Sequence, residues 1–307
     1  MYDMIVIGGG PAGYTAALYA VRAGLSCAVI EKMSIGGQLT LTDIVDNYPG
    51  FNEGVDGITL GMQMQSGAER FGAESIFDEV TALELDGEIK KVFCCSGEYE
   101  ARSVVIATGA SPRQLGLDSE SELTGRGVHY CAHCDGRFYK GKSVAVIGGG
   151  NSAVGDALYL CRICEKVTLI HRRDTLRASR IYDAPLASAE NIEIMYNSRA
   201  ESFARAEDGK LTGLNIVDTV SGKESRFACD GVFVSIGRVP ASELVRGILE
   251  TDESGYIVAD ESTRTSVAGV FAAGDVRTKA LRQIVTATAD GAVAVHYAEE
   301  YLSGIDK

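Results

Sequence analysis

The sequence predicts an α/β protein built from two similar doubly wound parallel sheets, each with an inserted β-meander. Three observations support this prediction: an internal repeat, a glycine-rich turn at the same place in both copies, and an excess of glycine. Glycine accounts for 36 of the 307 residues, while only 5 are proline and none is tryptophan. The usual glycine share is ~7%, and an excess without proline is typical of tight turns around a ligand. A chain of this length is expected to form two domains.

The repeat consists of residues 4–31 and 144–171, which align without a gap at an offset of 140. Each copy has a β-branched run, a glycine turn, a helical stretch and a second apolar run, which is the order of a βαβ unit. The turns read G-x-G-x-x-G and G-x-G-x-x-A. The first glycine permits the bend, the second lets backbone amides approach a pyrophosphate, and the third small residue seats the helix. The repeat therefore predicts two Rossmann-like dinucleotide-binding domains.

The residues that end the two units differ in charge. Glu31 ends the first unit, where a carboxylate accepts ribose hydroxyls and repels a 2′-phosphate, so FAD or NAD is favoured. The second unit ends in His171, Arg172 and Arg173, with Arg177 four residues later. Guanidinium groups at this place suit a 2′-phosphate and favour NADPH. The alternative is a solvated basic surface.

The remaining order of segments predicts how the two domains are connected. In each half a strand-rich stretch with turn signals precedes a buried strand that ends in glycine, at residues 104–109 and 232–237. The last segment, which ends in a helical stretch, has no counterpart in the second half. We therefore expect a discontinuous first domain and a second domain inserted into it, with the boundaries 1–112 and 241–307 against 113–240.

Two C-x-x-C motifs have different expected roles. Cys131 and Cys134 are either half of a zinc site or a redox dithiol, and zinc would normally need a second pair. Cys161 and Cys164 fall late in the second dinucleotide helix, so we expect buried packing there and no metal site. Asp135, directly after the first motif, is a candidate for proton transfer to a thiolate, with a helix-cap role as the alternative.

The charge balance excludes some partners. The chain has 29 basic and 42 acidic residues and a net charge of −13, which disfavours nucleic acid and anionic membrane surfaces. No apolar run approaches the ~20 residues of a membrane span, and no signal-peptide pattern is present. We therefore expect a cytoplasmic protein with no nucleic-acid or membrane partner.

The order of motifs resembles that of one enzyme family along essentially the whole chain. The segments GGGPAG, GGQL, VDNYPGF, ATG, CAHCDG, GGGNSA, HRRDTLR and FAAGDVRTKALRQ are similar to those of the low-molecular-weight thioredoxin reductases. The resemblance is specific because the dithiol shortly precedes the second nucleotide turn, whereas lipoamide-dehydrogenase-like reductases carry it in the first domain. It implies a homodimer that passes electrons from NADPH through FAD and the Cys131–Cys134 pair to thioredoxin or a thioredoxin-like protein.

The resemblance also implies the roles of the domains and of single residues. Residues 1–112 and 241–307 would bind FAD, and residues 113–240 would bind NADPH and carry the dithiol. The catalytic residues would be Cys131, Cys134 and Asp135, with Cys134 nearest the flavin. FAD would be held by Gly8, Gly10, Pro11, Ala12, Gly13, Glu31, Gly37, Gln38, Leu39, Asn47, Thr108, Gly109, Gly274, Asp275, Arg282, Gln283 and Ile284. NADPH would be held by Gly148, Gly150, Asn151, Ser152, Ala153, His171, Arg172, Arg173, Arg177, Ile236 and Gly237.

Two histidines depart from the family pattern. His133 stands between the cysteines, where threonine is most often found, and His129 precedes them. His133 has two readings, electrostatic stabilisation of a thiolate or no essential role. These departures concern which protein substrate is used, and they leave the expected type of reaction unchanged.

Three other functions fit parts of the sequence. A small-molecule dithiol oxidase would not need the arginine cluster. The flavoprotein of an alkyl hydroperoxide reductase system carries an additional N-terminal disulfide-relay domain, whereas here the first strand begins at residue 2. A non-catalytic nucleotide sensor would not need a C-x-x-C between two complete nucleotide sites.

Overall fold

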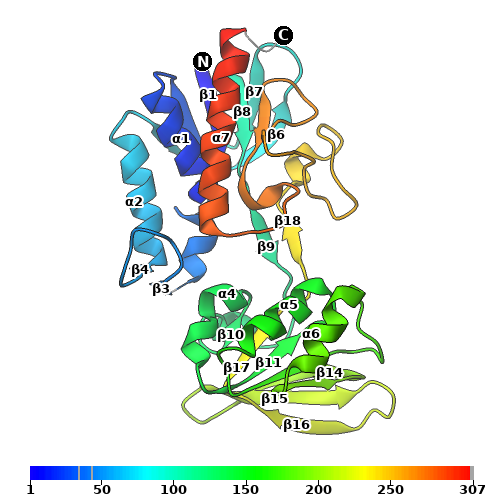
Figure 1. The fold of residues 1–307 in the computed structure, drawn as a ribbon. Coiled ribbons are helices and arrows are strands. Elements are labelled where there is room, and N and C mark those ends of the chain that lie inside the picture. The colour runs from blue at the N-terminus through cyan, green and yellow to red at the C-terminus, as the bar shows by residue number, and fades with distance from the viewer. Residues whose placement is uncertain (34, 43, 305–307) are drawn as a thin grey trace. The chain divides into compact units, whose positions relative to one another are not determined.

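The computed structural model describes residues 1–33, 35–42 and 44–304 (Figure 1). By its contacts the chain divides into two compact units, Met1–Ser111 with Val239–Lys307, and Pro112–Arg238. The chain crosses between them twice. The crossing segments form strands β9 (Ala110–Pro112) and β18 (Arg238–Pro240), which pair as a two-stranded sheet.

The core of the first unit is a parallel sheet. Strand β1 (Tyr2–Ile7) lies between β2 (Cys27–Glu31) and the long β8 (Glu98–Ile106), and both pairings are parallel. β5 (Glu74–Phe77) extends the sheet beyond β2, and β19 (Val270–Ala272) pairs with the C-terminal half of β8. The two halves of the sequence that flank the inserted unit therefore meet in one sheet.

The meander of the first unit belongs to the same sheet. β6 (Val80–Glu84) and β7 (Lys90–Cys94) run antiparallel, and β7 pairs antiparallel with the N-terminal half of β8. Apolar side chains of the meander join those of β1 and β2 and of residues 245–259 in one buried cluster. The sheet face that bears Ile5 and Ile7 is thus covered by side chains of the meander and of residues 245–259.

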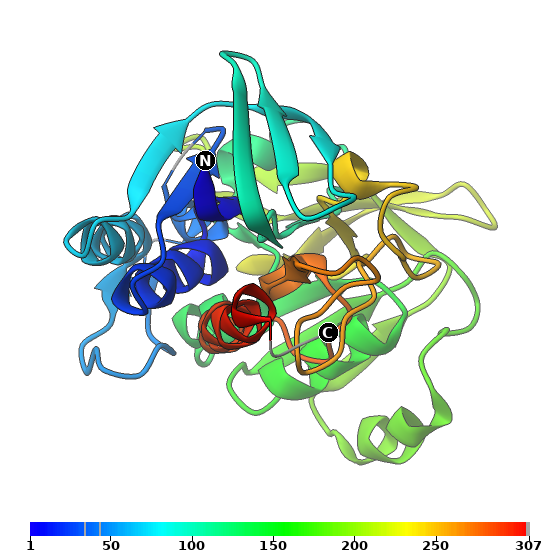
Figure 2. The same ribbon diagram turned by 90° about the horizontal axis from the view of Figure 1, so that it is seen from above.

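Helices cover the other face of this sheet. α1 (Pro11–Arg22) and α7 (Ile284–Ser303) lie side by side in both views, and α2 (Gly57–Glu69) lies next to α1 (Figures 1 and 2). Small residues permit the close approach of α1 and α7, because a Cβ on Gly291 would lie 2.3 Å from the carbonyl oxygen of Ala12. This packing fixes the N-terminus of α1 beside the glycine turn after β1.

The second unit repeats the parallel core. Its sheet has the order β10 (Val128–His129), β17 (Gly231–Val234), β11 (Ser143–Ile147), β12 (Lys166–Ile170) and β13 (Ile192–Met195), with all pairings parallel. Alternate residues of β11 face opposite sides, Val144 and Val146 one way and Ala145 and Ile147 the other. Both faces are therefore buried, as is usual for parallel strands.

A helical layer and a second sheet cover the two faces of the parallel sheet (Figure 1). α5 (Asn151–Leu160) and α6 (Asp183–Ser188) pack on the face of Val144 and Val146. The opposite face packs on an antiparallel sheet formed by β14 (Ser198–Arg205), β15 (Leu211–Asp218) and β16 (Glu224–Ala228). The meander of this unit is thus a separate layer, unlike that of the first unit.

Short elements complete the two units. They are the strands β3 (Ile44–Val45) and β4 (Val55–Asp56), the helices α3 (Glu120–Leu123) and α4 (Ala132–Asp135), and the 3₁₀ helices Gly37–Leu41, Gly136–Tyr139, Arg180–Tyr182, Glu243–Val245 and Gly274–Val276. Over the described ranges, none of the helices has the length and apolar character that crossing a membrane requires.

Candidate active site

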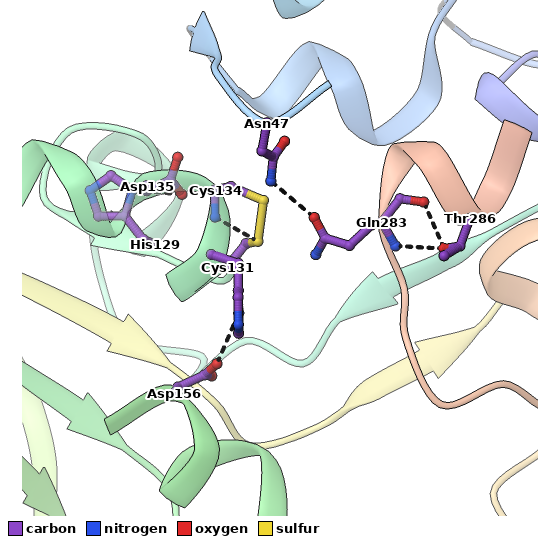
Figure 3. The surroundings of a disulfide bond; sticks show 9 residues. Asn47, His129, Cys131, Cys134, Asp135, Asp156, Gln283 and Thr286 are labelled. Carbon is purple, nitrogen blue, oxygen red and sulfur yellow. Dashed lines mark hydrogen bonds and ion pairs between the residues drawn. A yellow bond between two sulfur atoms is a disulfide. The ribbon is translucent and has the colours of Figure 1, made fainter. Parts of the chain in front are cut away.

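The first C-x-x-C forms a disulfide at the start of a short helix (Figure 3). Cys131 precedes α4 as its N-cap residue and Cys134 lies within it, with their Cα atoms 5.3 Å apart. The backbone N–H of Cys134 donates to Sγ of Cys131 at 3.2 Å. Within residues 1–33, 35–42 and 44–304, no group of His, Cys, Asp or Glu side chains has the arrangement of a metal site. The structure therefore presents this pair as a disulfide, the oxidised form of a dithiol.

Asp135, the residue after the dithiol, belongs to a buried polar group. Its Oδ2 lies 3.1 Å from Nδ1 of His129, and Nε2 of the same imidazole lies 2.7 Å from the hydroxyl of Tyr139. His129 ends β10 and Tyr139 ends the 3₁₀ helix that follows α4, so three short elements bring the group together. Burial, and then the nearby Asp135 carboxylate, raise the pKa of the Tyr139 hydroxyl well above its usual range. Tyr139 therefore keeps its proton.

His133, between the two cysteines, lies on the surface of α5. Its ring stacks on Tyr159 with centroids 4.1 Å apart, and its Nδ1 is 4.0 Å from a carboxylate oxygen of Asp156. Burial raises the pKa of Asp156, and a hydrogen bond from Ser235 and the charge of His133 partly oppose that rise. The His133 side chain is about half exposed, and water screens electrostatic interactions at such a position.

The first glycine turn has the geometry of an anion site. A Cβ on Gly8 would lie 2.5 Å from the carbonyl oxygen of Ala107, and one on Gly13 would lie 1.9 Å from that of Gly8, so neither position tolerates a side chain. A Cβ on Gly10, in contrast, would meet nothing within 4 Å. Gly10 caps α1 and supplies no side-chain hydrogen bond, and Pro11 begins the helix. The first backbone N–H groups of α1 have no partners within the helix, and the space beside Gly10 is open. A pyrophosphate could accept hydrogen bonds from these N–H groups there.

Glu31 lies at the end of β2 beside this turn, as the fingerprint predicts. Its two carboxylate oxygens accept hydrogen bonds from the backbone N–H groups of Gly9, at 2.6 Å, and Met33, at 2.9 Å. Each oxygen has a second lone pair, so the carboxylate is fixed in position and can still accept from ribose hydroxyls.

The other predicted FAD residues of the first unit lie in loops and in helices that adjoin them. Asn47 donates to Oε1 of Gln283 at 3.1 Å, which joins two predicted residues 236 positions apart (Figure 3). Arg282 stacks on the ring of Tyr256, and its guanidinium donates to the backbone carbonyls of Asp275 and Arg277. The remaining predicted residues are Ala12 in α1, Gly37, Gln38 and Leu39 in a 3₁₀ helix, Thr108 and Gly109 after β8, Gly274 and Asp275 after β19, and Ile284 at the start of α7.

The second glycine turn repeats this geometry in the other unit. A Cβ on Gly148 would lie 2.4 Å from the carbonyl oxygen of Ser235 and 2.5 Å from Cβ of Ala153, whereas one on Gly150 would meet nothing within 4 Å. Gly150 caps α5, again without a side-chain hydrogen bond. The side chain of Asn151 accepts from the backbone N–H of Ser179 at 2.7 Å, which holds the loop after β12 against this turn.

The basic residues after β12 fall into two groups. Arg172, Arg173 and Arg177 are exposed, and the backbone N–H of Arg177 donates to the carbonyl of Gly149. His171 is buried against Gly149, and burial lowers the pKa of its imidazole. The three arginines thus have the exposure that an anion would need, whereas His171 supports the turn. Ser152 is exposed in the first turn of α5, and Ile236 and Gly237 follow β17.

The remaining cysteines carry free thiols. Cys27, Cys164 and Cys229 are buried, as expected for packing, and burial raises the pKa of Cys164 to about 11 and those of Cys27 and Cys229 to about 12. Cys161 is half-buried and its Sγ donates to the carbonyl of Leu158. The second C-x-x-C thus consists of two free thiols that follow the end of α5 at Leu160 and do not lie within the helix, and of the two only Cys164 is buried.

Two polar groups near the site were not predicted from the sequence. The contact between His129, Asp135 and Tyr139 joins residues without helical or strand spacing, so periodicity gives no signal for it. The carboxylate of Asp290 accepts from the backbone N–H of Gly274 and from Lys279, at 2.9 and 2.6 Å. That bond ties α7 to the loop that carries Gly274 and Asp275. An acidic residue among the small and apolar residues of the first half of α7, IVTATADGAVAV, is a signal that would have identified it.

Known proteins with similar sequences and structures extend these observations. Residues 2–291 match the sequence profile of the family described as pyridine nucleotide-disulphide oxidoreductase. Thioredoxin reductase of Listeria monocytogenes is 47% identical over 302 residues, covering 98% of this chain and 94% of that protein. Thioredoxin reductase of Bacillus subtilis is 47% identical over 305 residues, covering 98% and 96%. The crystal structure of thioredoxin reductase from Streptococcus pyogenes has a TM-score of 0.92 at 42% identity and covers 99% of both chains.

The two glycine turns, the dithiol and these similarities, which extend over nearly the full length of the sequence, all indicate the same family. The chain belongs to the pyridine nucleotide-disulphide oxidoreductase family and, within it, to the thioredoxin reductases.

Proposed function

We propose that this enzyme passes two electrons from NADPH through FAD to the Cys131–Cys134 disulfide, and from the resulting dithiol to the disulfide of thioredoxin or a thioredoxin-like protein. The observation that carries the proposal is the disulfide at the start of α4, within the unit that also holds the second glycine turn. The relatives named thioredoxin reductase support the identity of the acceptor.

FAD and NADPH are assigned to the two turns by charge. We place FAD at the turn of Gly8 and Gly10, where Glu31 would accept from ribose hydroxyls, and NADPH at the turn of Gly148 and Gly150, where the exposed arginines would contact a 2′-phosphate. The discontinuous first domain would then bind FAD and the inserted domain NADPH. The chemistry that these cofactors supply when bound is a two-electron hydride transfer, which protein side chains cannot provide.

The dithiol carries out the exchange with the protein substrate. The thiolate of Cys131 attacks one sulfur of the substrate disulfide, a mixed disulfide forms, and the other substrate sulfur leaves as a thiolate. The thiolate of Cys134 then attacks Sγ of Cys131, which restores the Cys131–Cys134 disulfide and releases the second substrate thiolate. Each released thiolate takes up one proton. Cys131 is assigned as the attacking residue because the N–H of Cys134 donates to its sulfur and would stabilise its thiolate.

Asp135 is the group that we assign to proton transfer. It follows Cys134 directly, and its side chain is partly accessible, unlike the buried His129 beside it. A carboxyl group in this position can protonate a departing thiolate and be reprotonated from solvent. The helix-cap alternative is less well supported: Asp135 occupies the N-cap of the 3₁₀ helix Gly136–Tyr139, but its side chain makes no capping hydrogen bond there, and Cys131 is the N-cap of α4.

The enzyme is further proposed to act as a cytoplasmic homodimer. The first unit exposes large apolar side chains, such as Met33 at 81% and Phe77 at 60%, which a second copy of the chain would cover. Sedimentation equilibrium of the flavin-loaded protein tests this proposal, and a single species with the mass of one chain would contradict it.

We also propose that the two units alternate between two arrangements, one for reduction of the flavin and one for its reoxidation. A relative supports this: the structure of Lactococcus lactis thioredoxin reductase, which is 39% identical, is described as the FR conformation of that enzyme. A reversible cross-link engineered between the two units should stop turnover without loss of FAD. A cross-linked enzyme that turns over at the rate of the free enzyme would contradict alternation.

The reaction is tested with purified holoenzyme, NADPH and oxidised thioredoxin. The wild type should oxidise NADPH in proportion to the thioredoxin disulfide supplied. Cys131→Ser and Cys134→Ser should lose this turnover by several orders of magnitude, because a single thiol cannot complete the exchange. In both variants NADPH should still bleach the flavin. Turnover that survives either substitution would show that the electrons leave by another route.

A further inference from the structure

The buried histidine beside the dithiol has both of its ring nitrogens engaged. His129 is 5% exposed, and its two nitrogens contact Asp135 at 3.1 Å and Tyr139 at 2.7 Å. Its ring stacks on Phe233 with centroids 5.3 Å apart. Figure 3 shows His129 and Asp135 side by side next to the disulfide. An imidazole held by two hydrogen bonds and a stacking contact has one orientation.

The surroundings of Tyr139 determine where the protons of this group lie. Its hydroxyl is buried, and the acidic groups near it are Asp135, Cys229, Asp230 and Cys164, all of which raise its pKa further. The ammonium group of Lys142 lies over the ring face, 5.4 Å from the centroid. Tyr139 therefore remains protonated and donates to Nε2 of the imidazole. The proton of a neutral His129 must then be on Nδ1, from which it is donated to the Asp135 carboxylate.

We propose that His129 is a positioning residue that orients the Asp135 carboxylate through its Nδ1–H and stabilises the negative charge left there when Asp135 protonates a thiolate. The proton moves from the carboxyl group to sulfur, the carboxylate remains, and the imidazole N–H carries a hydrogen bond to it throughout. The inference rests on the proposed function, because it needs Asp135 to exchange a proton with the dithiol or its substrate. It goes beyond that function in assigning a role to a residue that does not touch the reacting sulfurs.

Two substitutions of the same histidine separate this role from mere packing. The amide nitrogen of asparagine takes the place of the imidazole Nδ1, whereas that of glutamine takes the place of Nε2. His129→Asn therefore keeps a donor toward Asp135, and His129→Gln keeps a polar group toward Tyr139 only. Both variants leave polar atoms in the same buried site, so a general loss of packing would affect them alike.

The expected results follow from loss of one hydrogen bond to a charged group. His129→Gln should lower kcat for thioredoxin reduction about tenfold with the KM for NADPH unchanged. The pH profile of kcat in this variant should move to higher pH, because a carboxylate that has lost its hydrogen-bond donor holds a proton more tightly. His129→Asn should stay within about threefold of the wild type and keep its pH profile. Equal losses in the two variants, or no loss in either, would overturn the proposal.

A double-mutant comparison tests whether His129 acts through Asp135. Asp135→Asn alone should lower kcat more than His129→Gln does, and adding His129→Gln to it should cause no further loss. Multiplicative losses would show that His129 acts independently. Flavin content and Tm of each variant serve as folding controls.

The tautomer of the wild-type holoenzyme provides a test that needs no variant. Nitrogen-15 NMR of histidine-labelled protein should show His129 with a proton on Nδ1 and none on Nε2, and the opposite tautomer would overturn the proposal. If the wild type does not reduce thioredoxin, the proposed function fails. If it does, while His129 has the opposite tautomer or the variants behave alike, only the inference fails.

Discussion

Substitution of the middle glycine of each turn should separate the two cofactor sites without unfolding the protein. Gly10 has φ −84° and ψ −174°, which alanine adopts without strain, and its Cβ would meet nothing within 4 Å. Gly10→Ala should therefore cost only about 1 kcal/mol of stability, the usual penalty for alanine at an N-cap. The added methyl group would, however, occupy the space through which a pyrophosphate approaches the amides of α1.

The loss of cofactor affinity can be worked from the hydrogen bonds that are displaced. A hydrogen bond to a charged group contributes about 1.5 to 3 kcal/mol, so two lost amide contacts weaken FAD binding by about 3 to 6 kcal/mol, or about 10² to 10⁴-fold. Gly10→Ala should thus purify without flavin and with a Tm close to that of apoprotein prepared from the wild type. Flavin absorbance and isothermal titration with FAD measure both quantities.

The matched control is Gly150→Ala in the second turn, where the Cβ is equally free of contacts. This variant should retain its flavin and lose NADPH binding, the reverse of Gly10→Ala. Gly13→Ala provides the opposite control, because its Cβ would lie 1.9 Å from the Gly8 carbonyl oxygen and must force the turn and helix apart. A Gly10→Ala protein with a full complement of flavin, or a Gly150→Ala protein without it, would refute the assignment of the two turns.

Other substitutions and the cysteine reactivities test the remaining assignments. Changing Arg172 and Arg173 together to alanine should raise the KM for NADPH about thirtyfold, because each exposed charge contributes about 1 kcal/mol to binding. The KM for NADH should not change. An equal change for both nucleotides would contradict the 2′-phosphate contact. Cys161→Ser should leave turnover within about twofold, and a large loss would identify a second redox centre. In the reduced enzyme at pH 8, iodoacetamide should alkylate Cys131 long before Cys164, whose pKa of about 11 leaves about one thiolate in a thousand. Labelling of Cys164 should rise tenfold per pH unit up to about pH 11, and fast labelling at pH 8 would show that it is not buried in solution.

The parts of the fold that follow from local patterns were predictable. The repeat placed both βαβ units, and the structure has them at Tyr2–Glu31 and Ser143–Ile170, because glycine turns, β-branched strands and small helix residues are each locally encoded. The difference between the two meanders was not predictable. In the first unit the meander is hydrogen-bonded to the parallel sheet through β8, and in the second it is a separate sheet that stacks on a face. That choice depends on long-range pairing, which alternation within one strand does not specify.

The candidate site likewise has residues whose positions could be predicted from the sequence and residues whose contacts could not. The positions of Glu31 and of the arginines after β12 follow from their place at the ends of strands, since those ends meet the glycine turns in any βαβ unit. The burial of His171 could not be predicted in this way. Its ring fills the space beside Gly149 that a side chain at that position would otherwise occupy. The contacts of His129 with Asp135 and Tyr139 likewise depend on three short elements that meet only in the folded unit.

The number of electrons that the enzyme takes up per flavin tests most directly whether the Cys131–Cys134 disulfide is a redox centre. An anaerobic titration with dithionite should show that the wild type takes up about two two-electron equivalents per flavin, one for FAD and one for the Cys131–Cys134 disulfide. Cys134→Ser should take up about one. A wild type that is saturated by one equivalent, with its disulfide still intact by thiol counting, would contradict the account that the disulfide is the second redox centre of the relay.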